Sequence, residues 1–212
     1  MTDEELQKLF QYDNGTLRNK ANIRNAEKLS DYEYRTVAKN TLWLLNRRRL
    51  FIPNGVDDLA KIHKFLFSEI YDWAGEFRNY YLSKNGTDFM PPTAFKAAFH
   101  NINLQVKTIN LQNKPNNFNY AKLLDSVNYL HPFREGNGRT TRLFIQLIAI
   151  GHNQFISYDR QSKEVIRALQ SSNIQQLSNF MQIEDVVNKQ EALKKAATKQ
   201  FILINKKQRH NR

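Results

Sequence analysis

The sequence predicts an all-α fold with one small β-hairpin. Apolar residues recur every three or four positions along most of the chain, the spacing that places them on one face of an α-helix. Residues 77–92 depart from this pattern and carry aromatic residues on both sides of Asn85-Gly86. An Asn-Gly pair between two short β-prone segments is typical of a hairpin turn. We therefore expect one helical domain that carries a single hairpin.

The apolar spacing also locates the individual helices. It predicts helices over residues 26–46, 56–71, 93–112 and 120–130, another that begins at about residue 139, and shorter ones in the last third of the chain. Thr93 follows a pair of prolines and is a candidate N-cap. Ser162 is a candidate cap of a later helix, and Asp185 is expected to open the last one.

The composition limits where the protein works. The chain of 212 residues is 41% hydrophobic, which is enough to bury one core. It has no cysteine, so a disulfide framework is excluded and a reducing cytoplasm is the expected location. The acidic start lacks the basic segment and apolar run of a signal peptide. The longest apolar stretch, residues 143–150, is too short to span a bilayer, so no membrane association is expected.

The net charge of +12 is concentrated near the C-terminus. Residues 189–212 carry eight basic side chains and one acidic side chain, a net of +7, which leaves +5 on residues 1–188. We therefore divide the chain into a main domain, residues 1–188, and a basic helical tail, residues 189–212. Such a tail can bind acidic partners, but a solvated helix is the more common explanation, and nucleic acid is not the expected partner.

Residues 131–142 hold more chemically useful side chains than any other segment. They read His131-Pro132-Phe133-Arg134-Glu135-Gly136-Asn137-Gly138-Arg139-Thr140-Thr141-Arg142. Pro132 ends the preceding helix, and the glycines allow successive N–H groups to point into one concavity. The next helix begins near Arg139, and the N-terminus of a helix favours an anion such as phosphate.

The side chains of this segment suit a nucleoside triphosphate. Arg139 and Arg142 are three positions apart on one helix face, so both can reach a polyphosphate. Glu135 supplies the hard oxygen ligand that Mg²⁺ prefers beside phosphates. His131 can accept a hydroxyl proton near neutral pH. The segment therefore predicts a triphosphate, held with a divalent metal, and a nucleophile that loses a proton.

Other motifs fit the segment poorly. A P-loop requires Gly-Lys-Ser/Thr, and a dinucleotide-binding fingerprint requires a glycine where Thr141 stands. A zinc site requires a second histidine close by, whereas His152 lies well down the following helix. An ordinary helix-loop-helix turn explains any one of these residues but not the whole segment.

At every specified position the segment resembles the Fic family motif, His-x-Phe-x-(Asp/Glu)-Gly-Asn-Gly-Arg-x-x-Arg. Residues 70–76 resemble the family's segment before its substrate-positioning flap, and residues 14–20 resemble the start of small stand-alone bacterial members. The resemblance covers residues 10–185. It implies a Fic-like helical fold and a protein adenylyltransferase, which moves AMP from ATP to a Ser, Thr or Tyr hydroxyl of a target protein.

The resemblance also implies a role for each residue. It makes His131 the base, Phe133 a buried anchor of the loop and Glu135 the Mg²⁺ ligand. It assigns the phosphates of ATP to Gly136, Asn137, Gly138, Arg139 and Arg142. It assigns the alignment of the target's extended backbone to the hairpin residues Thr87, Asp88, Phe89 and Met90, of which the last two are equally compatible with ordinary core positions.

Two alternatives remain open from the resemblance. In the related Doc-type kinases a lysine replaces the glycine at position 138, ATP binds in the reversed sense and the γ-phosphate is transferred. Gly138 leaves room for the orientation that transfers AMP, so adenylylation is expected and phosphoryl transfer is the alternative. The other alternative is a catalytically inactive Fic-like module whose basic tail binds nucleic acid.

The sequence lacks the family's inhibitory helix, whose pattern is Ser/Thr-x-x-x-Glu-Gly/Asn. No Glu in the chain has Ser or Thr four residues before it. The resemblance is therefore to toxins that a separate small antitoxin inhibits by placing its Glu against the residue equivalent to Arg142. The alternative is non-standard inhibition by the C-terminal helix through Glu191.

Overall fold

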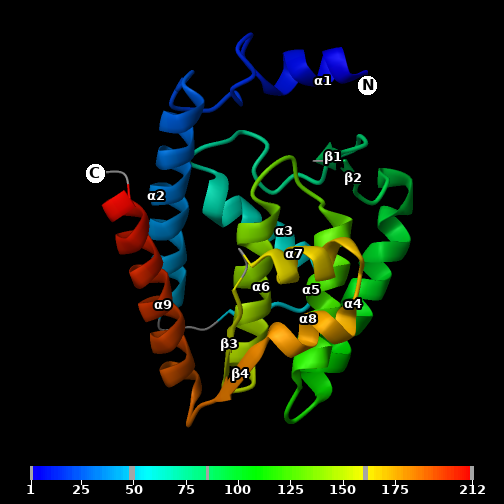
Figure 1. Ribbon diagram of the computed structural model, residues 1–212, viewed down its shortest axis with the longest axis vertical. Helices are drawn as coiled ribbons and strands as arrows, with labels where there is room; N and C mark the ends of the chain where they lie inside the picture. The colour runs from blue at the N-terminus through cyan, green and yellow to red at the C-terminus, as the bar shows by residue number, and fades with distance from the viewer. Residues whose placement is uncertain (1, 48–50, 85, 160–161, 211–212) are drawn as a thin grey trace.

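The computed structural model describes residues 2–47, 51–84, 86–159 and 162–210 (Figure 1). The helices are α1 (Asp3–Phe10), α2 (Ala26–Leu45), α3 (Val56–Phe67), α4 (Phe95–Leu111), α5 (Asn117–Leu130), α6 (Asn137–Gly151), α7 (Lys163–Gln170), α8 (Ile174–Phe180) and α9 (Lys189–His210). The strands are β1 (Ser83–Lys84), β2 (Thr87–Asp88), β3 (Gln154–Ser157) and β4 (Gln182–Asp185), and Pro92–Ala94 form a short 3-10 turn. The predicted all-α fold with a small hairpin is confirmed.

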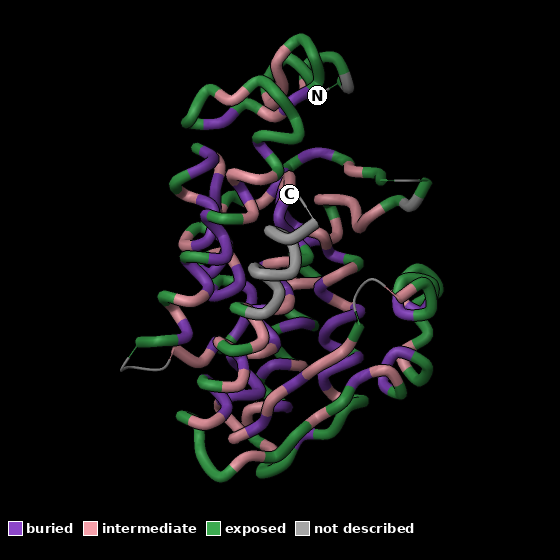
Figure 2. Tube along the Cα trace, turned by 60° about the vertical axis from the view of Figure 1, so that its left-hand side comes forward, coloured by how far each residue is buried: buried purple, intermediate pink, exposed green. Residues whose placement is uncertain are grey.

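Helix α6 lies at the centre of the molecule. Ten of its 15 residues are buried, and it packs against α3, α5, α9 and β3. Figure 2 shows buried stretches of the chain inside the bundle and exposed stretches along its outside. The core therefore fixes the position of the N-terminus of α6, where the motif lies. Although α6 is apolar, neither it nor any other helix in the described part of the chain is long and apolar enough to cross a membrane.

The predicted hairpin is present. β1 and β2 pair antiparallel, with Ser83 opposite Asp88 and Lys84 opposite Thr87; Asn85 of the predicted turn lies outside the described residues. A second antiparallel pair, β3 with β4, was not predicted. Its two strands are four residues each and distant in sequence, so no turn signal joins them and the local pattern does not reveal their pairing.

The predicted helix starts were correct in part. Ser162 caps α7, since its side chain accepts the N–H of Val165. The prediction for Thr93 was wrong, because the 3-10 turn precedes α4 and no side chain caps that helix. The prediction for Asp185 was also wrong: it ends β4, and Asn188 accepts the N–H of Glu191 at the start of α9.

The first half of α9 belongs to the core. Ala192, Leu193 and Ala196 are buried, and α9 lies beside α2 (Figure 1). The basic residues of this helix therefore stand on a segment that begins as a packed helix. The division of the chain after residue 188 stays a prediction.

Candidate active site

The motif comprises the end of α5, a short loop and the start of α6. His131 is the C-cap of α5 and has a left-handed backbone, with φ of 42°. This conformation is uncommon for a residue other than glycine. Its N–H still donates to the carbonyl of Val127 at 3.2 Å. The candidate base therefore lies where the chain turns out of the helix.

The ring of His131 is held in its neutral form. Nδ1 lies 3.3 Å from the carbonyl oxygen of Asn128, which accepts a hydrogen bond from it. Phe89 of the hairpin stacks on the ring, with 3.6 Å between the ring centroids. Burial lowers the pKa of His131 to about 4. At neutral pH the proton is therefore on Nδ1, and Nε2 is available to accept another.

The side chain of Asn137 holds the loop closed. Its Oδ1 accepts the N–H of Phe133 at 2.9 Å, and its Nδ2 donates to the carbonyl of Phe133 at 2.7 Å. Asn137 is 4% exposed and Phe133 is fully buried. Both backbone groups of Phe133 thus find partners inside the protein, where an unpaired polar group is costly. The Asn137 side chain is committed to the loop, which leaves its backbone N–H to face an anion.

His63 of α3 supports the same loop and was not identified from the sequence. Its Nδ1 accepts the N–H of Gly75 at 2.8 Å, so Nε2 carries the proton and donates to the carbonyl of Glu135 at 2.9 Å. Its ring stacks on Phe133 with 3.8 Å between centroids. Burial lowers the pKa of His63 to about 4. A lone histidine on the apolar face of a helix gives no sequence signal for this role.

The N-terminus of α6 has no side-chain cap. Gly136 is the N-cap residue and has φ of +82°. A Cβ atom at this position would lie 2.4 Å from Cζ of Phe67, so space and backbone conformation both require glycine. Gly138 is exposed, and a Cβ there would meet only Nη1 of Arg142, at 3.5 Å. Backbone N–H groups at the start of a helix that has no side-chain cap are of the kind that bind phosphate.

Glu135 directly precedes the start of α6 and is present as a carboxylate. Its Oε1 accepts the N–H of Gly136 at 2.9 Å, and Nζ of Lys84 in β1 is 3.8 Å from its Oε2. Burial alone would raise the pKa of Glu135. The Gly136 N–H and the charges of Lys84 and Arg139 outweigh burial, so the pKa lies below its usual value.

Arg139 is paired with two carboxylates. Its Nη2 is 3.0 Å from Oε2 of Glu33 in α2 and 3.4 Å from Oε1 of Glu135. The hydroxyl of Tyr71 donates to the other oxygen of Glu33, and the guanidinium lies 4.8 Å from the centre of the Phe67 ring. Glu33 was not predicted, because it comes from a helix about a hundred residues away in sequence. The first motif arginine is therefore held at the site before any ligand arrives.

The hairpin lies against the motif. Phe89 stacks on His131, and the N–H of Met90 donates to the carbonyl of Tyr129 at 3.0 Å. Asp88 is exposed, and the backbone of Thr87 pairs with Lys84. The structure thus brings all the residues predicted for the hairpin to the same side of the molecule as the predicted base.

The site suits one magnesium ion held mainly by its substrate. No group of three or more His, Cys, Asp or Glu residues in the described ranges is placed to hold a metal. Mg²⁺ is usually bound through one or two carboxylates together with phosphate oxygens and water. The ionised Glu135 beside the start of α6 is a carboxylate of the kind that would meet that requirement.

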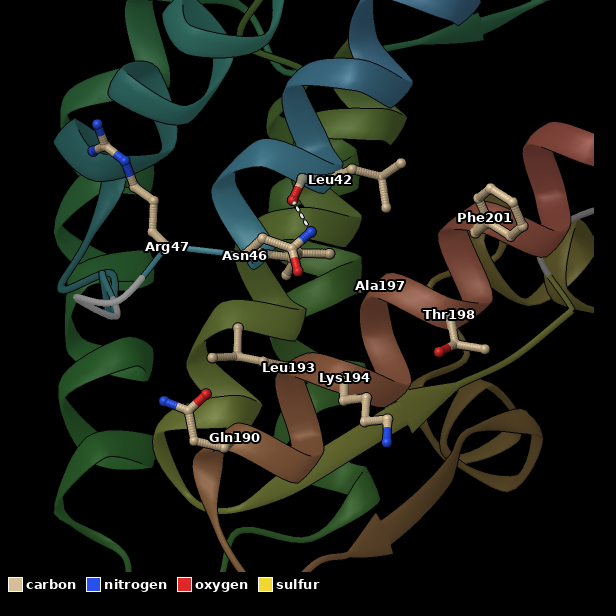
Figure 3. A pocket seen from close by; sticks show the side chains of 10 residues that line it. Leu42, Asn46, Arg47, Gln190, Leu193, Lys194, Ala197, Thr198 and Phe201 are labelled. Atoms are coloured by element: carbon tan, nitrogen blue, oxygen red, sulfur yellow. Dashed lines mark hydrogen bonds between the residues drawn. The ribbon is translucent and has the colours of Figure 1, made fainter.

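One surface groove lies away from the motif. A groove of about 500 Å³ runs between α2 and α9, lined by Leu42, Asn46 and Arg47 on one side and by Leu193, Lys194, Ala197 and Phe201 on the other (Figure 3). None of its lining residues belongs to the motif or the hairpin.

Gly136→Ala should lower the free energy of unfolding by about 2 kcal/mol or more, because alanine resists the left-handed backbone and overlaps Phe67. Gly138→Ala is the matched control and should change it by less than about 0.5 kcal/mol, since a Cβ fits there. Urea unfolding measures both. Equal losses in the two variants would show that the tight approach to Phe67 is not a constraint.

His63 should make stability depend on pH. Its pKa is about 4 in the folded protein and 6.5 in the unfolded chain, so its stabilising effect is complete above pH 6.5 and lost as pH falls through about 4. Between these limits the free energy of unfolding falls by up to about 1.4 kcal/mol for each pH unit. His63→Gln should reduce the slope and leave the part due to His131, whose pKa is also about 4, whereas substitution of the exposed His100 by Gln should not reduce it. Urea unfolding at pH 7, 6 and 5 tests this, and an unchanged slope in His63→Gln would refute it.

Comparison with known families supports the motif. Residues 53–149 match the Fic/DOC family. This segment extends from just before α3 almost to the end of α6 and contains every motif residue.

Two curated relatives are protein adenylyltransferases from Bartonella. The chain is 36% identical over 118 residues to VbhT of Bartonella schoenbuchensis, covering 53% of this chain and 25% of that protein. It is 32% identical over 170 residues to the protein of Bartonella henselae, covering 70% of this chain and 31% of that one. The chain therefore spans a quarter to a third of the length of these relatives.

Solved structures share the fold. The BepC protein of Bartonella tribocorum, determined with bound AMPPNP, has a TM-score of 0.72 at 20% identity and covers 84% of this chain and 98% of that one. An N-terminal Fic domain from Bartonella quintana with bound ADP has a TM-score of 0.70 at 23% identity, covering 82% of this chain and 95% of that one. The family match, the motif and the fold agree, and residues 53–149 of this chain are similar to the Fic/DOC family.

Proposed function

We propose that this protein is an adenylyltransferase that transfers AMP from ATP to a Ser, Thr or Tyr hydroxyl of a target protein. The observation that carries the proposal is the placement of a neutral His131 between the hairpin and the uncapped N-terminus of α6. The names of the two Bartonella relatives support the same activity.

The N-terminus of α6 would hold the phosphates of ATP. Backbone N–H groups from Gly136 to Gly138 and the partial positive charge of the helix favour an anion there. Arg139 follows in the first turn, and Arg142 lies beside Gly138. The two guanidinium groups would bind the β- and γ-phosphates by charge-assisted hydrogen bonds. Mg²⁺ on Glu135 would neutralise phosphate charge when bound.

His131 would act as the base. Its Nε2 takes the proton of the target hydroxyl while that oxygen bonds to the α-phosphorus. The bond from the α-phosphorus to the bridging oxygen of the β-phosphate breaks, and pyrophosphate leaves. The negative charge of bound ATP raises the pKa of His131 above its value in the empty site, towards the range in which a base is most effective.

The hairpin would align the target. Strands β1 and β2 are two residues each and pair with one another, so an extended target segment can add to their outer edge. Phe89 lies on His131, which places the target's hydroxyl side chain near the base when its backbone pairs here. The roles of Thr87, Asp88 and Met90 in this alignment are part of the proposal.

Gly138 supports AMP transfer over phosphoryl transfer. The position is exposed and borders Arg142, so glycine leaves open the space proposed for the phosphates. The Doc-type kinases carry a lysine at this position. The kinase reaction remains the alternative outcome of the labelling experiment below.

We also propose that the protein works in the cytoplasm as a toxin restrained by a separate antitoxin. No Glu of the chain has the spacing of the family's inhibitory helix. Glu191, the alternative inhibitor within the chain, is half-buried and accepts the N–H of Val187 at the start of α9. Its carboxylate is thus used at the start of its own helix, which supports a brake supplied by a partner.

The reaction is tested with labelled ATP and a bacterial lysate. Label on the α-phosphate should appear on protein and label on the γ-phosphate should not, because pyrophosphate leaves. His131→Ala should reduce labelling by roughly 10²- to 10⁴-fold, the usual contribution of a general base. Binding of ATP should change little, since the phosphates are held by the N-terminus of α6. Transfer of the γ-label would establish the kinase alternative, and full labelling by His131→Ala would exclude this base.

A further inference from the structure

Arg78, just before the hairpin, is a buried cation whose hydrogen bonds all go to backbone carbonyls. The residue is 4% exposed. Nε donates to the carbonyl of His131 at 2.8 Å, and Nη2 donates to that of Leu130 at 3.3 Å. The remaining bonds of the guanidinium go to the carbonyls of Tyr80, at 2.5 Å, and Met90, at 2.6 Å. One planar group thus joins the end of α5 to both ends of the hairpin.

The end of α5 is joined to the hairpin at four successive carbonyls. The carbonyls of Leu130 and His131 accept hydrogen bonds from the Arg78 side chain. The carbonyl of Pro132 accepts the backbone N–H of Arg78 at 2.8 Å. The carbonyl of Tyr129 accepts the N–H of Met90. The last carbonyls of a helix have no partner within it and carry its negative partial charge, so a buried cation is stabilised there.

The guanidinium shape matters for this arrangement. Its N–H groups form a rigid fork that can reach several carbonyls at once, whereas the ammonium of lysine is a single point donor. The face of Phe95 lies 5.0 Å from the guanidinium carbon and restricts its movement. Burial lowers the pKa of Arg78, but arginine remains charged in proteins.

We propose that Arg78 is a positioning residue that fixes the hairpin relative to His131 and so sets where a target hydroxyl meets the base. Arg78 itself touches neither reacting group. It acts through the backbone of His131 on one side and through Tyr80 and Met90 on the other. The expected effect on catalysis rests on the proposed adenylyl transfer. The role of Arg78 in holding the hairpin against His131 does not.

The test compares Arg78→Lys with Arg18→Lys. Arg18 is a matched control, because its Nε also donates to a backbone carbonyl, that of Lys8 at 3.2 Å, and its guanidinium also lies over an aromatic ring, that of Tyr12. In Arg78→Lys the rate of AMP transfer from α-labelled ATP should fall roughly 10- to 100-fold, because small misplacements of reacting groups are costly. The Kd for Mg·ATP should stay within about twofold, since α6 holds the phosphates. Arg18→Lys should change neither quantity.

Histidine NMR signals provide a readout that does not need activity. The ring protons of His131 are shifted by the stacked Phe89, and those of His63 by the stacked Phe133. In Arg78→Lys the His131 signal, assigned by its loss in His131→Ala, should move towards the position of a free histidine, while the His63 signal stays in place. An unchanged His131 signal, or equal movement of both signals, would overturn the proposal. If wild-type protein transfers no AMP but the His131 signal moves alone, the coupling stands and the proposed function fails.

If Arg78→Lys does not fold, the same NMR signals are followed in the wild-type protein as it is warmed. If Arg78 holds the hairpin against His131, the Nε–H signal of Arg78 and the His131 signal should broaden together, before the His63 signal changes. Separate transitions for Arg78 and His131 would overturn the proposal.

Discussion

The paired hydrogen bonds between the Asn137 side chain and the backbone of Phe133 determine the geometry of the active site. They connect the first residue of α6, ten of whose 15 residues are buried, to the loop that follows His131. Loss of this amide would leave two buried backbone groups without partners, at about 1–3 kcal/mol each. His63 reinforces the same loop from α3 through the carbonyl of Glu135. The loop between α5 and α6 is therefore held in place by contacts with the core.

Charges at the site are paired in advance for an anionic ligand. Arg139 is held by Glu33 and Glu135, and Glu135 also accepts the Gly136 N–H. Phosphates that bind there would replace the carboxylates as hydrogen-bond acceptors of these N–H groups and of the guanidinium. Mg²⁺ on Glu135 would offset the added negative charge. Burial also keeps the ring of His131 neutral, so its Nε2 can accept a proton.

The sequence was informative where chemistry is local. The motif, the hairpin at residues 77–92 and the capping of α7 by Ser162 follow from neighbouring residues, and the structure has these elements there. His63, Arg78 and Glu33 were missed, because each acts on a segment more than 50 residues away through contacts that no spacing rule encodes. The β3–β4 pair was missed for the same reason. The motif position of Asn137 predicts a phosphate contact, which stays a prediction; its side chain is bonded to the backbone of Phe133.

Hydrogen exchange at the Phe133 amide tests most directly whether the core preorganises this loop. The N–H donates to the buried Asn137 side chain, so it should exchange only when the protein unfolds globally. The protection factor of the Phe133 amide should then equal that of the Phe144 amide in the centre of α6, within about tenfold. Exchange at Phe133 that is about a hundredfold faster or more would show that the loop opens on its own, and would contradict a preformed site.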